Sequence, residues 1–155
     1  MIDTNVLRGI DLFQHLDPIH LAHLASIGEV REHKKNAVLF EEGDDGSHIY
    51  LVVNGSVRIS KMVPGIGEEA LAVLRTGAYF GEMEFIEPDL DRAAHAVVHE
   101  RCTLYAFSYE DLRTLFNADR DFALAVQEQL LKTLARRLRA TNDKVTAMFA
   151  MAQFG

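Results

Sequence analysis

The feature that most limits what this chain can fold into is a central stretch of short, strand-like runs interrupted by glycines. Runs rich in valine, isoleucine and tyrosine fill residues 29–108. They predict strands, because β-branched and aromatic residues suit a pleated sheet and glycines suit tight turns. The candidate strands are 30–33, 38–41, 48–53, 56–62, 69–74, 94–99 and 102–107. Many short strands with glycine turns indicate a closed sandwich or a jelly roll.

Helical patterns flank this stretch on both sides. Residues 3–28 predict short helices, one of which starts at Asp17-Pro18, a capping acid followed by a proline in the first turn. After Ser108 the pattern predicts a short helix over 109–116 and a long one over about 120–151.

A length of 155 residues predicts a single domain, residues 1–155, with a buried core. We expect the mainly β class with flanking helices (α+β). N-terminal helices would occupy 1–28, a jelly-roll β-roll 29–108 and C-terminal helices 109–155.

Composition narrows the classes of function. The net charge of −7 argues against wholesale nucleic-acid binding, which needs a basic face. The single cysteine, Cys102, excludes an internal disulfide framework and suits a reducing compartment. The N-terminus lacks the pattern of a signal peptide, and no apolar run approaches membrane-spanning length. We therefore expect a cytoplasmic protein that makes no membrane contact.

The stretch FGEMEFIEPDLDRAAHAV, which starts at Phe80, carries the residues with the clearest chemistry. Gly81-Glu82 is followed ten residues after Glu82 by Arg92. A glycine lets backbone approach a ligand, a carboxylate accepts hydrogen bonds from ribose hydroxyls, and a guanidinium grips a phosphate with two donors. Residues 84–87, ahead of Pro88, predict one helical turn whose N–H groups point at an anion. These groups together suit a small anionic sugar phosphate.

In this order, between two strand-like segments, the residues resemble the phosphate-binding cassette of the cyclic-nucleotide-binding domain family. Upstream, EEGDDGSHIYLVVNGSVRIS and LRTGAYFGE resemble the family's entry to the β-roll and the turn before the cassette. Downstream, TLYAFSYEDLRTLF resembles the last roll strand and the short helix after it. ARRLRATNDKV is similar to the ligand-facing helix of bacterial catabolite activators. The resemblance runs from about Leu12 to about Val145.

The resemblance implies a role for each cassette residue. Arg92 would pair with the cyclic phosphate, Glu82 would accept the ribose 2′-hydroxyl, and Gly81 would let the backbone approach the sugar. Considered alone, Arg92 is a solvated surface arginine, Glu82 a helix-entry acid and Gly81 a turn glycine. The implied ligand site comprises Phe80 (also expected in the core), Gly81, Glu82, Met83, Arg92, Ala93, Ala94, Thr141 and Asn142.

The resemblance also implies a base preference. A threonine after the arginine tends to accompany cGMP in the family, and Ala93 cannot offer that hydroxyl, so cAMP is expected in preference to cGMP. Thr141 and Asn142 align with two polar residues that contact adenine, and an asparagine can both donate to and accept from an adenine edge. The alternative is that Thr141 only belongs to the apolar stripe of the long C-terminal helix, described below, and that Asn142 is exposed to solvent. No other cofactor, no metal and no catalytic residue is expected.

Two residues depart from the family pattern. Glu84 stands where alanine or serine is usual. It does no harm if it faces outward, and it weakens phosphate binding by repulsion if it faces inward. His95 replaces a small hydroxyl residue or a tryptophan. It is either a packed strand residue or, when charged near the phosphate, a group that strengthens binding at lower pH.

The long C-terminal helix carries an apolar stripe with alternating gaps of three and four residues. Such a stripe is typical of a two-stranded coiled coil and predicts a homodimer, although it could pack on its own β-roll instead. The stripe consists of Leu131, Leu134, Leu138, Thr141, Val145, Met148 and Ala152.

We interpret the chain as a stand-alone sensor whose C-terminal helix moves when a cyclic nucleotide binds, and whose effector protein is unknown. A cupin-like enzyme is disfavoured, because no His-x-His pair exists and His95 and His99 would lie roughly 13 Å apart on a strand. Two alternatives stay open. One is the ligand-binding part of a DNA-binding regulator, although the sequence ends at Gly155 and no DNA contact is expected; saturable binding of random duplex at low salt would favour it. The other is an interaction module that no longer binds nucleotide.

Overall fold

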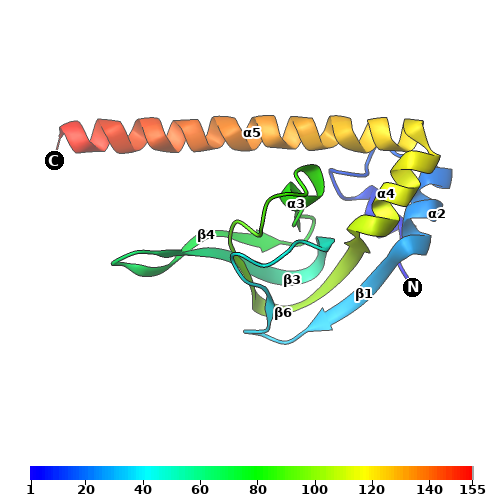
Figure 1. Cartoon of the computed structure of the whole chain (residues 1–155), viewed down its shortest axis with the longest axis horizontal. Helices are drawn as coiled ribbons and strands as arrows, with labels where there is room; N and C mark the ends of the chain where they lie inside the picture. The colour runs from blue at the N-terminus through cyan, green and yellow to red at the C-terminus, as the bar shows by residue number, and fades with distance from the viewer. Residues whose placement is uncertain (155) are drawn as a thin grey trace.

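The glycine-interrupted centre of the chain forms one antiparallel sheet, shown in Figure 1 within a computed structural model that describes residues 1–154. The four long strands lie in the order β1-β6-β3-β4, β2 pairs with β6, and β5 pairs with β3. The strands are β1 (Gly28–His33), β2 (Val38–Phe40), β3 (His48–Val63), β4 (Gly67–Arg75), β5 (Tyr79–Phe80) and β6 (His95–Ser108). The predicted jelly-roll-like fold is confirmed. It is not closed, since no pairing joins β1 to β4 among the described strands.

Strand β3 joins two runs that the sequence pattern had separated at Gly55. The register against β6 shifts between Val52 and Asn54 and again between Asn54 and Ser56, so the strand bends here without ending. Gly55 has φ +83°, and a Cβ at this position would lie 2.1 Å from the carbonyl oxygen of Arg101. The glycine therefore marks a close approach between β3 and β6, where the pattern had predicted a turn. Strand β6 likewise joins two predicted runs.

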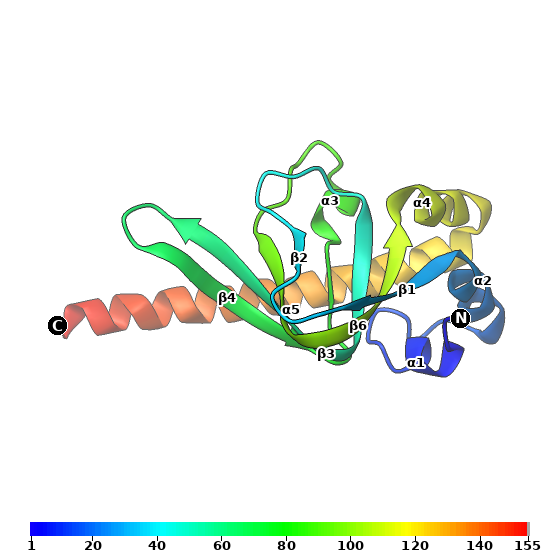
Figure 2. The same ribbon diagram turned by 90° about the horizontal axis from the view of Figure 1, so that it is seen from below.

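Helices α1 (Thr4–Arg8), α2 (Pro18–Ile27) and α4 (Tyr109–Ala118) gather at one end of the roll, as Figure 2 shows. The short α3 (Met83–Ile86) lies away from that end, and α5 (Arg120–Gln153) starts there and runs along the molecule. The predicted cap at Asp17 is confirmed, since its carboxylate accepts a hydrogen bond of 2.8 Å from the N–H of His20. Ser108 and Asp119 cap α4 and α5 in the same way.

The core is divided into two clusters by the sheet. One cluster joins the helices to the sheet and includes Leu21, Phe107 and Phe122. The other fills the inside of the roll and includes Val52, Val98 and Leu104. This division leaves the cassette between β5 and β6 beside both clusters.

Helix α5 packs on the rest of the molecule only near its start. Its buried residues are Phe122, Val126, Gln129 and Leu130, Thr133 and Leu134 are partly buried, and every residue from 135 to 154 is exposed. Figure 1 shows the far half of α5 extending past the roll, in the direction of the β3–β4 hairpin. Within residues 1–154 no helix combines the length and apolar character needed to cross a membrane.

Candidate functional site

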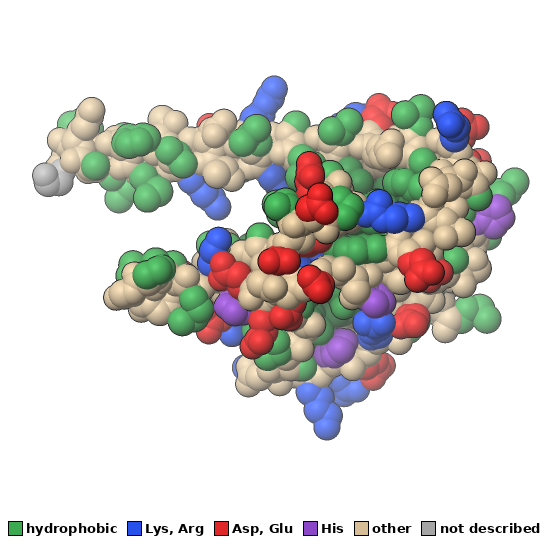
Figure 3. All heavy atoms as spheres, viewed as in Figure 1, with side chains coloured by type: hydrophobic (Ala, Val, Ile, Leu, Met, Phe, Trp, Pro, Cys, Tyr) green, Lys and Arg blue, Asp and Glu red, His purple; other side chains and the backbone are tan. Residues whose placement is uncertain are grey.

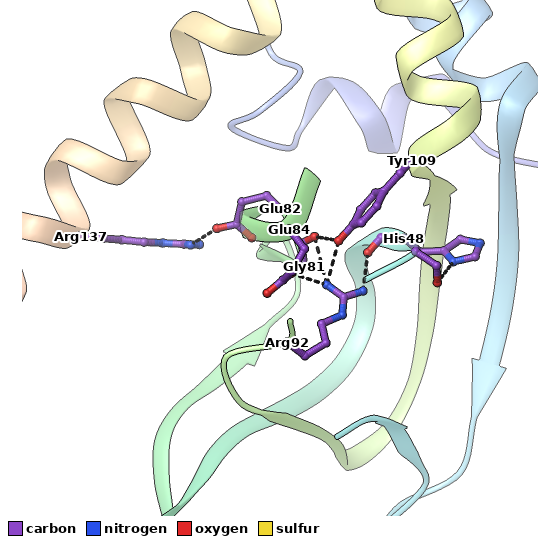
Figure 4. Close-up of polar contacts among 8 residues, drawn as sticks. His48, Gly81, Glu82, Glu84, Arg92, Tyr109 and Arg137 are labelled. Atoms are coloured by element: carbon purple, nitrogen blue, oxygen red, sulfur yellow. Dashed lines mark hydrogen bonds and ion pairs between the residues drawn. The ribbon is translucent and has the colours of Figure 1, made fainter. Parts of the chain in front are cut away.

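The cassette is a loop and one helical turn held between β5 and β6, with α4 beside it and α5 across it (Figure 4). The predicted helical turn is present as α3, one residue earlier than expected. The backbone of Arg92 is fixed from the opposite side. Its N–H donates to Asp44 (2.7 Å) and its carbonyl accepts from Gly43 (2.9 Å). The Gly43-Asp44 turn therefore sets where the Arg92 side chain enters the site.

Gly81 is required by the geometry of the site. Its φ of +84° is a conformation that favours glycine, and a Cβ there would lie 2.7 Å from the carbonyl oxygen of His48 and 2.9 Å from Nη1 of Arg92. A side chain at position 81 would therefore push the guanidinium out of its place. The group that lies against Gly81 here is Arg92, and the approach of the Gly81 backbone to a sugar stays a prediction.

Arg92 is buried, with 3% of its surface exposed, so it is not the solvated surface arginine that its neighbours in the sequence suggest. Nη1 donates to the Glu84 carboxylate at 2.7 Å and to the carbonyl oxygen of Gly81 at 3.2 Å. Nη2 donates to the carbonyl oxygen of His48 at 3.0 Å. Nε is buried and has no hydrogen-bond partner among the described residues. A buried guanidinium with an unused donor can still accept an anion on that side.

Two aromatic rings complete the surroundings of Arg92. The Phe40 ring lies 4.0 Å from its Cζ, a cation–π distance. The Tyr109 hydroxyl accepts from Nη1 at 2.9 Å and donates to the carbonyl oxygen of Gly81. Burial raises the pKa of the Tyr109 phenol, so this hydroxyl remains a donor at neutral pH. Low dielectric around the guanidinium strengthens any charge–charge contact made there.

Glu82 is buried and points away from Arg92, toward α5 (Figure 4). Its carboxylate forms an ion pair with Nη1 of Arg137. Arg137 also lies against Tyr79, with its Cζ 5.3 Å from the ring centroid. The residue that the resemblance assigns to the ribose is therefore linked directly to the long helix.

Glu84 faces inward, which decides the alternative left open by the sequence. It is 5% exposed, and its carboxylate contacts Nη1 of Arg92. Figure 4 shows it beside Tyr109, on the Arg92 side of the cassette.

The other predicted ligand residues are spread over the roll, the cassette and α5. Phe80 is buried in the roll and stacks on Tyr50, with ring centroids 5.2 Å apart, as expected for a core residue. Met83 and Ala93 are exposed, and Ala94 is partly buried. Thr141 and Asn142 are exposed on α5, and no hydrogen bond or ion pair within residues 1–154 joins them to the cassette. Because a helix rises about 1.5 Å per residue, Asn142 lies about 7.5 Å beyond Arg137 along α5. Their contact with adenine stays a prediction.

His95 forms no hydrogen bond to Arg92 among the described residues. Its Nδ1 accepts a hydrogen bond of 3.1 Å from the N–H of Glu42. The structure therefore favours the packed strand residue of the two alternatives.

A groove of about 870 Å³ lies on the outside of the cassette, between α3, α4 and α5. Phe85, Phe116, Leu130 and Leu134 line it, and none of the predicted ligand residues does. We attribute it to incomplete packing of the helices and assign no ligand to it.

Sequence reasoning missed four residues that shape the site. Phe40, His48 and Tyr109 surround Arg92 from three separate elements, and no local motif marks them. Arg137 is an exposed residue of α5 that nevertheless reaches the buried carboxylate of Glu82. The signal was available in its position on the helix that the resemblance describes as facing the ligand.

The sequence of this chain is similar to those of known cyclic-nucleotide-binding proteins. A family model described as the cyclic nucleotide-binding domain matches residues 30–119. The cyclic AMP receptor protein of Thermus thermophilus is 35% identical over 136 residues, which are 88% of this chain and 61% of that protein. The CRP-like cAMP-activated global transcriptional regulator of Mycobacterium tuberculosis is 29% identical over 140 residues, 90% of this chain and 60% of that protein.

The fold comparison gives the same result. The crystal structure of the Thermus thermophilus catabolite activator protein matches with a TM-score of 0.77 and 32% identity, covering 89% of this chain and 62% of that one. This chain belongs to the cyclic nucleotide-binding domain family. It spans about 60% of the length of the curated relatives reported above.

Two histidines of the sheet, His33 at the end of β1 and His48 at the start of β3, predict a dependence of stability on pH. Burial, and then the nearby Arg31 charge, lower the pKa of both His33 and His48. Below the ordinary histidine pKa of about 6.5 the unfolded chain binds protons that the folded chain resists. We expect the free energy of unfolding to fall between pH 7.5 and 5.5, and to fall less in the His33→Gln/His48→Gln double variant. The free energy of unfolding is measured by urea titration at each pH. An equal fall in both proteins between pH 7.5 and 5.5 would contradict this prediction.

Proposed function

We propose that this chain is a cyclic-nucleotide sensor that binds cAMP in preference to cGMP, with the cyclic phosphate at Arg92 and the ribose at Glu82. One observation carries the proposal: a buried guanidinium, held by the cassette, keeps an unused Nε donor. A protein gains nothing by burying an unsatisfied donor, and a ligand oxygen would satisfy it. Membership of the family supports the class of ligand.

The proposed base preference has two supports. Ala93 follows Arg92 and offers no hydroxyl to a guanine amino group. Two relatives are named for cyclic AMP. The proposed contact of adenine with Thr141 and Asn142 requires α5 to come closer to the roll than it lies here, or a second copy of the chain to supply these residues.

The ion pair between Glu82 and Arg137 supports a lid mechanism. A carboxylate has two oxygens, so Glu82 can accept from Arg137 and from a ribose hydroxyl together. A nucleotide that fixes Glu82 would therefore hold α5 close to the cassette. Since a ligand shifts a conformation only by its differential affinity, a few kcal/mol of such preference is enough to move the helix.

We also propose that the chain forms a homodimer through α5. The seam residues Leu131, Leu138, Val145 and Met148 are exposed, which supports a role outside the chain's own core, whereas Leu134 is partly buried. Figure 3 shows apolar side chains along the far half of α5, beyond the roll. Exposed apolar side chains at coiled-coil spacing are stabilised when a second helix covers them.

A second candidate function is control of transcription as part of a longer protein. The Mycobacterium tuberculosis relative is named as a global transcriptional regulator and the Thermus thermophilus relative as a cyclic AMP receptor protein, and this chain covers about three fifths of each. The proposed ligand site and its link to α5 are the same whether the chain acts as a sensor by itself or as part of a longer protein.

The ligand proposal predicts a calorimetric result. Isothermal titration should detect cAMP binding, with cGMP weaker. The Arg92→Lys variant keeps the charge opposite Glu84 but loses the planar two-donor fork, so its affinity for cAMP should fall about tenfold or more, equivalent to about 1.5–3 kcal/mol. Arg58→Lys is the matched control, because Arg58 forms an ion pair with Glu68 between β3 and β4, outside the cassette. Equal affinities of the two variants would refute the role of Arg92.

The dimer proposal predicts a change in molar mass. In light scattering after size-exclusion chromatography, the chain should have the mass of two copies, and Leu138→Glu should have the mass of one. A charge in an apolar seam is strongly unfavourable. Ala140→Glu adds the same charge off the seam at an exposed position and should remain dimeric. A wild-type mass of about 17.4 kDa would contradict the proposal.

A further inference from the structure

The cassette contains a carboxylate where the ligand would bring its own negative charge. Glu84 lies 2.7 Å from Nη1 of Arg92, and the side chains of the two residues are 6% and 2% exposed. Within residues 1–154, Glu84 is the only acid that forms an ion pair with Arg92. The buried charge of the guanidinium is therefore already balanced by the protein itself.

The inward position of Glu84 is built by more than one element. Tyr109, from the start of α4, shares Nη1 of Arg92 with Glu84. Gly46, in the loop before β3, leaves space for it, because a Cβ there would lie 2.6 Å from Cβ of Glu84. Three separate segments therefore accommodate this one side chain.

The pair between Glu84 and Arg92 is nevertheless incomplete. Glu84 engages Nη1 alone, although a guanidinium and a carboxylate can form two parallel hydrogen bonds. Nε of Arg92 has no hydrogen-bond partner in the part of the chain that the structure describes. A phosphate has more oxygens than a carboxylate and can accept two parallel hydrogen bonds from a guanidinium. It can therefore accept from more of the Arg92 donors than Glu84 does.

Simultaneous binding of a cyclic phosphate and the Glu84 carboxylate to the Arg92 guanidinium is energetically unfavourable. Two anions within hydrogen-bond distance of one buried guanidinium repel each other in a medium of low dielectric. One of them has to leave. Glu84 belongs to a helix of four residues in which Met83 and Ile86 are exposed and Phe85 is buried in the core, so Glu84 would leave by a change of its own side-chain torsions while Phe85 holds the turn in place.

We infer that Glu84 is a built-in competitor of the ligand: its carboxylate occupies Arg92 in the free protein and has to leave before the cyclic phosphate binds. This inference rests on the proposed function of Arg92. Glu84 thereby lowers the affinity for cyclic nucleotide and sets the ligand concentration at which the sensor responds. It also keeps the buried arginine neutralised, and the fold intact, when no nucleotide is present.

The test compares Glu84→Gln with Glu87→Gln. Glu84→Gln keeps the shape and one acceptor but removes the charge, and Glu87→Gln removes an exposed charge from the same segment. By isothermal titration, Glu84→Gln should bind cAMP about tenfold more tightly or better, and Glu87→Gln should match the wild type. Glu84→Asp, which keeps the charge but shortens its reach, is the second variant in case Glu84→Gln does not fold.

Thermal unfolding gives an independent readout. Without ligand, Glu84→Gln should unfold at a lower temperature than the wild type, because Arg92 loses its counter-ion. Saturating cAMP should close this gap, since the phosphate then supplies the missing charge. A merely structural role of Glu84 predicts a gap that cAMP leaves unchanged.

The outcomes separate this inference from the proposed function. Tighter binding by Glu84→Gln supports both, even where the wild type binds too weakly to measure. If the wild type binds cAMP and Glu84→Gln binds it equally or more weakly, the competitor role is refuted and the sensor remains. If neither binds cAMP or cGMP at millimolar concentration, both are refuted, and the chain is an interaction module that keeps the fold.

Discussion

The buried positive charge of Arg92 is the constraint around which the cassette is organised. A guanidinium removed from water has to be matched by acceptors, and the chain collects them from β3, the cassette and α4. Gly81 is glycine because the guanidinium lies against it. Phe40 covers one face of the ion. Each of these residues has a physical reason that follows from the position of one cation.

The second organising contact joins the cassette to α5. Glu82 and Arg137 are 55 residues apart in the sequence, yet they pair where the long helix crosses the site. Beyond Arg137 the helix makes no described hydrogen bond to the roll, and its apolar stripe is exposed. The molecule therefore has a rigid part, the roll, and one long element attached to it near the ligand site. That arrangement suits a signal carried by the position of the helix, which is part of what we propose.

The sequence predicted the class of fold because local signals are strong there. β-Branched runs and glycines marked most strands, and Asp17-Pro18 marked the start of α2. The pattern was wrong at Gly55, because a glycine that ends a strand and one that permits a close crossing look the same locally. It also missed β5, whose two residues are too few to show a period. These failures occur where tertiary contacts, and not the local sequence, decide the backbone.

For the site, the sequence motif identified Gly81, Glu82 and Arg92 as candidate ligand residues, and in the structure all three belong to the cassette between β5 and β6. The motif could not predict which residue would pair with each charged side chain. Whether Glu84 faced in or out depended on a rotation within one helical turn, which sequence spacing does not fix. Tyr109 and His48 reach the same guanidinium from distant segments, so their roles depend on the fold as a whole.

The most direct test of this account is a crystal structure of the chain with cAMP bound. The account predicts a cyclic phosphate oxygen about 2.7–2.9 Å from the guanidinium nitrogens of Arg92, including Nε, with the Glu84 carboxylate turned away from Nη1. A nucleotide bound elsewhere on the molecule, with the pair between Glu84 and Arg92 still intact, would contradict it.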